Sequence, residues 1–243
     1  DLKNNLLDIT TGFPIRKEVI PGHLKAGWDI AFKLPLYFKI NSSKSFLQKF
    51  YLGAFYPFID LLIKIIYFPF NFVIPEKSLR VKEIDSLLFF KSQTYVDFIE
   101  KISNENLIYL NKNFDFLNWR LSAPDTKYKI YKISLKSKFI GYIIARDTIK
   151  HGVKCTGIID IVFLKNYSKY VKSAFAKIDI TSDLFLLMCN KNLYSKYSLK
   201  KCGFMRSTFN FHLITKNLSG RFNNQLLFDE KNWHLTWIDS DDL

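Results

Sequence analysis

The sequence is poor in the residues that mark several classes of protein. It has 9 glycines and 7 prolines among 243 residues, too few for a collagen-like or low-complexity chain. Its three cysteines, Cys155, Cys189 and Cys202, are too few and odd in number for a disulfide scaffold. A hydrophobic content of 48% excludes general disorder. A globular protein of one or two domains remains, and free cysteines without a secretion signal favour a cytoplasmic setting.

Acidic residues are also scarce, because 36 Lys and Arg face 22 Asp and Glu and leave a net charge of +14. Such a charge suits nucleic acid, an anionic membrane or a polyanionic cofactor. The lysines are scattered, however, and the heavy use of Lys, Phe, Tyr, Ile and Asn is what an AT-rich coding sequence gives. Lysines alternate with aromatic residues at 128–139, which suits single-stranded nucleic acid and equally a half-exposed strand. Nucleic acid is therefore not the expected partner.

One segment, residues 51–75, is far more apolar than the rest and reads YLGAFYPFIDLLIKIIYFPFNFVIP. Its length fits a membrane span, but Asp60 and Lys64 lie inside it and Pro57 and Pro69 interrupt it. Three interpretations remain open: a spanning helix, a helix at a membrane surface, or a linker helix packed between two domains. The linker helix is the one we favour.

From residue 79 onward, helical and strand patterns follow one another. Residues 86–104 carry apolar side chains at helical spacing and predict a helix. Residues 128–137 and 138–152 predict a hairpin. Further strands are expected at 156–164, 182–190 and 204–215, and helices at 168–178 and 191–202. The strand–helix–strand order within 156–190 implies a parallel pair. The whole order predicts an α/β fold with an α+β mixed sheet and helices on both faces.

Two segments 176 residues apart resemble each other: LKAGWDIAFKLPLYFKI at 24–40 and LKKCGFMRSTFNFHLIT at 199–215. Each has a Lys-bearing helix end, a glycine, an aromatic residue and an aromatic-rich strand. Gly27 and Gly203 stand where a helix ends in the left-handed conformation, which glycine adopts without steric cost. The repeat predicts the tail of one domain, a linker and a second, whole domain.

A helix that ends in Gly-aromatic before the last strands resembles the GCN5-related N-acetyltransferase (GNAT) superfamily. The segment Tyr194–Phe204 carries this resemblance, and Phe116–Arg120, Asp160 and Trp233–Asp241 are similar to tandem GNAT-like proteins often encoded with bacterial polysaccharide biosynthesis. The resemblance implies a GNAT-like fold, truncated at its N-terminus. Residues 1–46 would be the C-terminal remnant of a first domain, 47–78 an apolar linker and 79–243 a second domain.

The resemblance implies transfer of an acyl group from acetyl-CoA or another acyl-CoA to a small-molecule amine such as an amino sugar. The family binds the pyrophosphate at Gln/Arg-x-x-Gly-x-Gly/Ala, a turn of free N–H groups before a helix. The corresponding turn here holds Lys165, Asn166, Ser168 and Lys169 and has no glycine. It is left open whether this second domain binds CoA.

Four residues are candidates for catalysis. Tyr197 or Tyr194 would protonate the leaving thiolate, although the family's usual position, four residues before the glycine, is Leu199. In the first repeat that position is His23, a candidate acid or base. Asp160 lies within an apolar strand, where a carboxylate needs a partner. It would orient the amine, or else form a structural pair with a residue such as Arg146 or His151.

No metal is expected. Asp239, Asp241 and Asp242 are acids near the chain end and most often solvated, and His151 with Cys155 lacks a second pair of zinc ligands. The segment Asn118–Arg120 would either line an acceptor groove or place Trp119 in the core.

Three hypotheses follow. The first is an acyl-CoA-dependent N-acyltransferase, in which a splayed strand's N–H polarises the thioester carbonyl. The second is a catalytically degenerate GNAT-like scaffold or membrane-surface module, peripheral at the inner membrane face through 51–75. The third is an aminoacyl-tRNA-dependent transferase of the Fem type, which also has tandem GNAT-like domains. The oligomeric state is left open.

Overall fold

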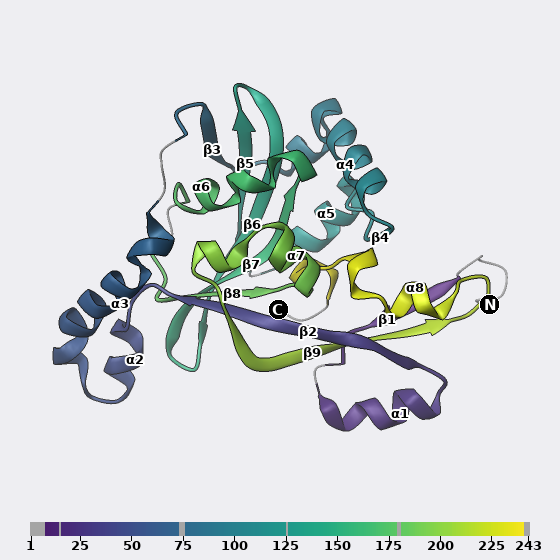
Figure 1. The fold of residues 1–243 in the computed structure, drawn as a ribbon, viewed down its shortest axis with the longest axis horizontal. Coiled ribbons are helices and arrows are strands. Elements are labelled where there is room, and N and C mark those ends of the chain that lie inside the picture. The colour runs from purple at the N-terminus through teal and green to yellow at the C-terminus, as the bar shows by residue number, and fades with distance from the viewer. Residues whose placement is uncertain (1–7, 15, 73–75, 125, 179–180, 241–243) are drawn as a thin grey trace.

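An eight-stranded mixed sheet organises the computed structural model, which describes residues 8–14, 16–72, 76–124, 126–178 and 181–240 (Figure 1). The strand order is β1-β9-β2-β8-β7-β6-β5-β3. The strands are β1 (Ile9–Gly12), β2 (Asp29–Ile40), β3 (Leu79–Ile84), β5 (Tyr128–Leu135), β6 (Lys138–Lys150), β7 (Val153–Phe163), β8 (Leu184–Met188) and β9 (Met205–Asn217). A short parallel pair, β4 (Ile108–Tyr109) with β10 (Trp233–His234), lies apart from this sheet.

Helices cover both faces of the sheet, as the element order predicts. Apolar side chains of α4 (Gln93–Glu105) and α5 (Phe114–Leu121) pack on one face, against Ile144 and Val162. Those of α6 (Val171–Phe175) and α7 (Lys191–Lys196) pack on the other, against Ile143 and Ile161. Residues 139–145 of β6 and 155–163 of β7 are buried on both faces of the sheet, which agrees with the mostly apolar sequence of these stretches.

The predicted pairings are confirmed. β5 and β6 form the hairpin, and β7 and β8 form the parallel pair. The single helix predicted at 86–104 is wrong, because a 3₁₀ turn at Leu87–Lys91 precedes α4. Between them Ser92 has extended backbone angles, and its side chain accepts a hydrogen bond from the N–H of Tyr95 as the N-cap of α4. The apolar spacing runs through the cap and conceals the boundary.

The two similar segments each adopt a helical turn, a left-handed glycine and a strand. In the first, α1 (Ile20–Lys25) ends before Gly27 and leads into β2; in the second, a 3₁₀ turn at Leu199–Cys202 ends at Gly203 and leads into β9. Both glycines are left-handed, with φ of 78° and 90°. The predicted helix-ending role of the two glycines is confirmed.

The two similar strands lie side by side in the sheet in a nearly symmetric arrangement. β2 and β9 pair antiparallel at the centre, β8 pairs with the free side of β2, and β1 pairs with the free side of β9. The offset of 176 residues that relates β2 to β9 also relates residues 8–12, which contain β1, to the β8 region. β2 is thus inserted between two strands of the C-terminal segment.

A helical hairpin projects from the edge of the molecule (Figure 1). It consists of α2 (Lys44–Lys49) and α3 (Tyr56–Asn71), joined by a turn at residues 50–55. Pro57 occupies the first turn of α3, where proline needs no N–H partner, so it begins the helix rather than breaking it. We call residues 44–72 the α2–α3 hairpin.

Candidate functional site

Strands β7 and β8 of the sheet move apart at the place where the GNAT resemblance predicts the cleft for the acyl donor. β7 and β8 pair only from Cys155 to Ile158, although β7 continues to Phe163. At the point of separation β7 carries a bulge, because Ile144 of β6 faces Asp160 while Ala145 faces Ile158. The resemblance expects the acyl donor at this splayed strand. The groups that surround the opening therefore decide what the site can do.

Asp160 is fully buried at the bulge and has four hydrogen-bond donors. Lys112 Nζ lies 2.8 Å from its Oδ1, and the Tyr142 hydroxyl lies 2.8 Å from its Oδ2. The Thr236 hydroxyl and the N–H of Ile161 also donate to Oδ1, at 2.7 and 3.0 Å. These four hydrogen bonds compensate for the loss of water around the Asp160 carboxylate, which is fully buried.

The cationic partner of Asp160 is Lys112, so the prediction of Arg146 or His151 is wrong. Lys112 is 1% exposed. Burial alone lowers the pKa of its ammonium group, but the carboxylates of Asp160 and Asp239 outweigh burial and hold that pKa above its ordinary value. His151 instead sits at the exposed β6–β7 turn with a φ of 52°. Lys112 and Asp160 thus form a buried ion pair at the bulge of β7.

Thr236 fills the opening between β7 and β8. It forms an isolated antiparallel bridge with Cys189, the residue after β8, while its hydroxyl reaches Asp160 in β7. The 3₁₀ turn Trp237–Asp239 that follows packs against β7 and is closed by a capping box between Thr236 and Asp239. The C-terminal segment therefore occupies the splay from the side of α5.

The N–H groups of β7 beyond the bulge are already bonded. Ile161 and Phe163 lie two residues apart, so their N–H groups point to the same edge of the strand. The first donates to Asp160, and the second donates to the buried Tyr197 hydroxyl at 3.0 Å. Burial raises the pKa of Tyr197 far above its ordinary value, so its hydroxyl stays neutral. Both N–H groups that would polarise a thioester carbonyl are satisfied within the protein.

A carboxylate also occupies the turn that corresponds to the family's pyrophosphate site. After β7, residues Lys165–Tyr170 form a 3₁₀ turn. The N–H of Lys165 donates to both carboxylate oxygens of Glu105, at 3.0 and 3.1 Å, and Lys196 Nζ lies 3.6 Å from one of them. Asn166 and Lys169 are exposed and Ser168 is half-buried on the same turn. The turn therefore binds a carboxylate of the protein itself, that of Glu105.

The other predicted catalytic residues lie on different elements. Tyr194 donates to the carbonyl of Phe204 at 2.7 Å, and its ring stacks on Tyr37 of β2 at 4.2 Å. His23 lies in α1, beyond β2 and β9, with its ring edge-on to Trp28 (Figure 1). The structure brings Asp160 and Tyr197 to the two sides of β7, and it places His23 elsewhere.

Burial shifts the pKa of two ionisable groups of the C-terminal segment toward the neutral form. Burial raises the pKa of Asp239 to about 6, although Lys112 opposes the shift. Burial, with Lys112 and Lys196 nearby, lowers the pKa of His234 well below its ordinary value. The expectation that Asp239 is solvated is wrong, whereas Asp241 and Asp242 lie outside the described residues. Lys112 and Asp160 form the buried ion pair of this region.

Metal-ligand and acceptor-groove candidates do not converge. Within the described residues no group of three or more His, Cys, Asp and Glu could hold a metal ion. Cys155 is buried while His151 is exposed. Trp119 is 68% exposed on α5, so the expected placement of Trp119 in the core is wrong.

Sequence reasoning missed Lys112, Thr236 and Glu105. Lys112 and Thr236 lie 48 and 76 residues along the chain from Asp160 of β7, and Glu105 lies 60 residues from Lys165 in the turn after β7. The one available signal was Asp160 itself, since a carboxylate in an apolar strand requires a buried partner.

Solved structures share this fold. A GCN5-related N-acetyltransferase from Anabaena variabilis has a TM-score of 0.53 and 16% identity, covering 86% of this chain and 46% of its own. A conserved Enterococcus faecalis protein of unknown function, described as a probable N-acyltransferase, has a TM-score of 0.52 and 11% identity, covering 86% and 45%. Protein-family models and curated proteins give no match. The fold is therefore GNAT-like, and the chain spans under half the length of these two proteins.

Proposed function

We propose that this protein is a GNAT-type N-acyltransferase of two repeats, in which residues 79–243 form a closed scaffold repeat. The observation that carries the proposal is Thr236, which fills the splay between β7 and β8. The acyl-CoA would bind in the first repeat, of which residues 1–46 form the C-terminal part. The acceptor would be a small-molecule amine such as an amino sugar.

The near-symmetric pairing of β1, β9, β2 and β8 supports two repeats that exchange their last strands. Such an exchange makes the second repeat a structural partner of the first, because β2 completes the sheet between β8 and β9. A closed second repeat then stabilises the first without binding the donor. This division of roles agrees with a pyrophosphate turn that has no glycine and is bonded to Glu105.

Calorimetric titration with acetyl-CoA tests the proposal. We expect no saturable binding to residues 1–243 and binding to a product that includes the whole first repeat. A ligand at 100 times its Kd stabilises its protein by about 2.7 kcal/mol, so a thermal melt checks the same point.

Two outcomes contradict different parts of the proposal. Saturable binding to residues 1–243 that weakens in Lys165→Gln/Lys169→Gln, but not in the control Lys101→Gln/Lys150→Gln, overturns the closed scaffold. All four lysines are exposed, so neither variant disturbs the core. Absence of binding to the longer product overturns acyl-CoA as the donor.

A further inference from the structure

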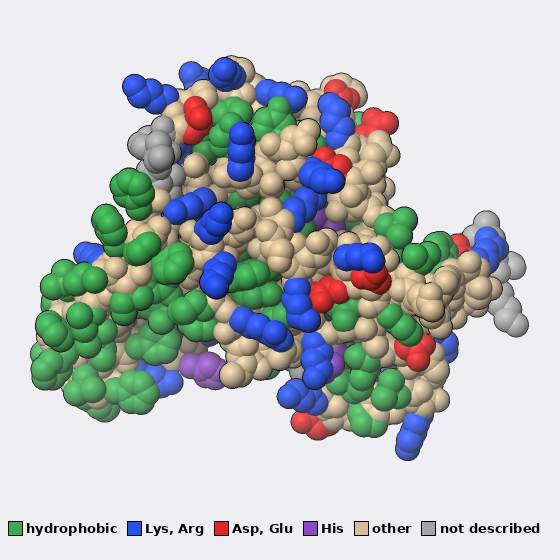
Figure 2. All heavy atoms as spheres, in the orientation of Figure 1, with side chains coloured by type: hydrophobic (Ala, Val, Ile, Leu, Met, Phe, Trp, Pro, Cys, Tyr) green, Lys and Arg blue, Asp and Glu red, His purple; other side chains and the backbone are tan. Residues whose placement is uncertain are grey.

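The α2–α3 hairpin exposes a continuous apolar face. On α3 the outward side chains follow helical spacing, and each is 54–65% exposed: Phe58, Leu61, Ile65, Ile66 and Phe68. The turn before α3 adds Phe50 and Phe55, which are 64% and 60% exposed, and Tyr51, which is 98% exposed. In Figure 2 these hydrophobic side chains cover the lower left of the molecule, over α2 and α3.

The opposite side of α3 is fixed to the sheet, which determines the direction of the apolar face. Tyr67 is buried, and the N–H of Ile40 in β2 lies 3.4 Å from its hydroxyl. Asp60 accepts hydrogen bonds from the hydroxyls of Ser42 and Ser43 and from the N–H of Ser43. These bonds hold the pKa of Asp60 below its ordinary value although burial opposes them. The helix cannot turn its apolar face inward without losing these contacts.

The charges around this face are positive. Lys44, Lys49 and Lys64 are exposed on the hairpin. The single acidic residue among 41–72 is Asp60, which is already bonded to the two serines. A face of aromatic and aliphatic side chains with lysines beside it matches the chemistry of an anionic bilayer surface.

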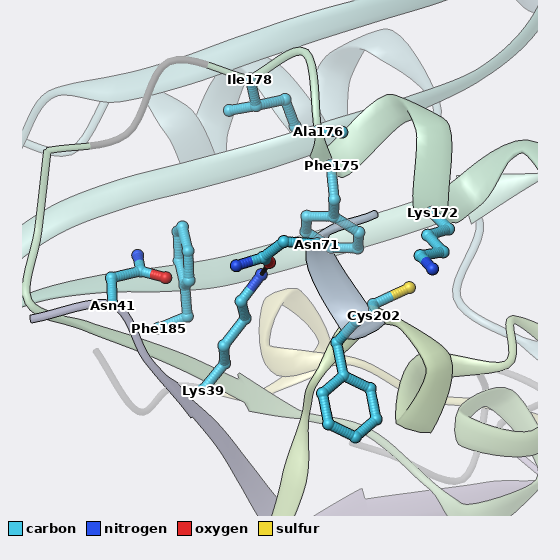
Figure 3. A pocket seen from close by; sticks show the side chains of 10 residues that line it. Lys39, Asn41, Asn71, Lys172, Phe175, Ala176, Ile178, Phe185 and Cys202 are labelled. Atoms are coloured by element: carbon cyan, nitrogen blue, oxygen red, sulfur yellow. Dashed lines mark hydrogen bonds between the residues drawn. The ribbon is translucent and has the colours of Figure 1, made fainter. Parts of the chain in front are cut away.

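A cationic cavity of about 290 Å³ lies beside the last turn of α3 (Figure 3). Its lining includes Lys39 of β2 and Lys172 of α6, the amides of Asn41 and Asn71, and no acidic residue. Lys39 donates to the Asn71 side chain at 2.9 Å and Lys172 to the carbonyl of Pro69 at 3.3 Å. Burial lowers the pKa of Lys39, and the charge of Lys172 lowers it further. A phosphate group between the two lysines would relieve this repulsion.

We propose that the α2–α3 hairpin docks this protein on an anionic membrane, with a lipid phosphate in the Lys39–Lys172 cavity. By length and composition, Gly53–Asn71 could also cross a membrane. The contacts of Tyr67 and Asp60 instead hold α3 along the surface of the sheet domain, so the helix lies in the interface plane. The aromatic side chains of the face suit the headgroup level of a bilayer. Docking of this kind does not require the protein to catalyse acyl transfer.

Vesicle co-flotation of residues 1–243 tests the docking. We expect strong binding to vesicles of phosphatidylcholine mixed with phosphatidylglycerol, weak binding to phosphatidylcholine alone, and a fall in affinity as salt is raised. Phe58→Ser/Ile65→Ser should weaken binding by roughly tenfold or more for each side chain. Each substitution removes most of the free energy gained when the apolar side chain moves from water into the bilayer. The matched control Leu88→Ser/Ile149→Ser changes side chains that are 65% and 68% exposed on other elements, and it should bind like the original protein.

Charge variants separate the headgroup contribution. Lys44→Gln/Lys49→Gln/Lys64→Gln should weaken binding by about fivefold for each lysine, whereas Lys101→Gln/Lys136→Gln/Lys150→Gln should not. Lys39→Gln/Lys172→Gln should reduce the preference for phosphatidylglycerol while leaving thermal stability in place. Equal binding by the Phe58→Ser/Ile65→Ser variant and the original protein overturns the proposal.

Analytical sedimentation without lipid tests whether a second copy of the protein, rather than a membrane, covers the apolar face. We expect a monomer at all concentrations. A concentration-dependent dimer that Phe58→Ser/Ile65→Ser abolishes, together with absence of flotation, means that a second copy covers the face and overturns membrane docking.

Discussion

At the scale of single residues, the buried pair of Lys112 and Asp160 dominates the energetics of the splay. Both side chains are almost completely excluded from water, and Asp160 is hydrogen-bonded on both oxygens. Removing one partner of such a pair is far more costly than removing an exposed pair, because the remaining charge stays buried. The pair therefore locks Thr236 and the bulge of β7 into one arrangement.

Lys112→Met tests this directly. The substitution removes the cation and leaves a buried carboxylate, so we expect a loss of about 3–5 kcal/mol in the free energy of unfolding measured in urea. Lys112→Met/Asp160→Asn should recover part of the loss because no charge is then buried.

Lys231→Met provides the comparison, since Lys231 pairs with Asp229 at the surface and is 75% exposed. It should leave the urea midpoint unchanged. Equal losses in the free energy of unfolding for the Lys112 and Lys231 substitutions would show that the buried pair stabilises the protein no more than the exposed pair does.

The sequence predicts one half of this pair and not the other. Asp160 requires a partner because it stands within an apolar strand. Lys112 carries no such signal: it lies in a polar stretch 48 residues earlier, and only the tertiary fold places it beneath β7. The same applies to Thr236 and Glu105, whose roles depend on long-range packing.

At the scale of elements, the two left-handed glycines form a natural comparison. Both Gly27 and Gly203 end a helical turn before a strand. A Cβ at Gly203 would meet ring carbons of Tyr67 at 3.0 Å, whereas at Gly27 the nearest neighbour is the Lys216 side chain at 3.7 Å. The same backbone conformation thus has different surroundings in the two similar segments.

We therefore expect Gly27→Ala to cost about 1–2 kcal/mol, which is the price of the left-handed conformation alone. Gly203→Ala should cost more because the ring of Tyr67 must move. Gly22→Ala in α1 should be neutral or stabilising, because a Cβ at this position would meet no atom of another part of the protein within 4 Å. Urea unfolding measures all three, and a smaller loss for Gly203 than for Gly27 contradicts the account.

Elements with strong local patterns were predictable, and their boundaries and partners were less so. Alternation and turn residues predicted β5 and β6, and the glycine positions predicted the starts of β2 and β9. The break at Ser92 was missed because apolar spacing continues across it. The insertion of β2 between β8 and β9 was also missed, because strand order depends on contacts that the chain sequence does not encode locally.

At the scale of the whole molecule, β2 joins the N-terminal segment to the rest. It pairs along both edges, and its Leu34 and Tyr37 are buried. The covalent connection through the α2–α3 hairpin is therefore not what holds the two segments together.

A protease site inserted after Tyr51, which is 98% exposed in the turn of the hairpin, tests this. After cleavage, we expect residues 1–51 and 52–243 to elute together in size-exclusion chromatography and to separate in concentrated urea. Separate elution in native buffer would show that β2 is held mainly by its connection.

The pairing of the first strands with a late one also shapes biosynthesis. β2 ends at Ile40 and β1 at Gly12, yet both pair with β9, which is complete only at Asn217. At about 5–20 residues per second, a ribosome needs roughly 10–35 s to synthesise the intervening chain. β2 has neither neighbour until β8 is complete at Met188, and it lacks β9 until Asn217, so for much of that time it is an unpaired apolar strand, a form prone to aggregate. Messages truncated before β9 should therefore yield insoluble, chaperone-bound products, whereas a message that extends through Ser240, and so includes the buried C-terminal segment, should release a soluble protein.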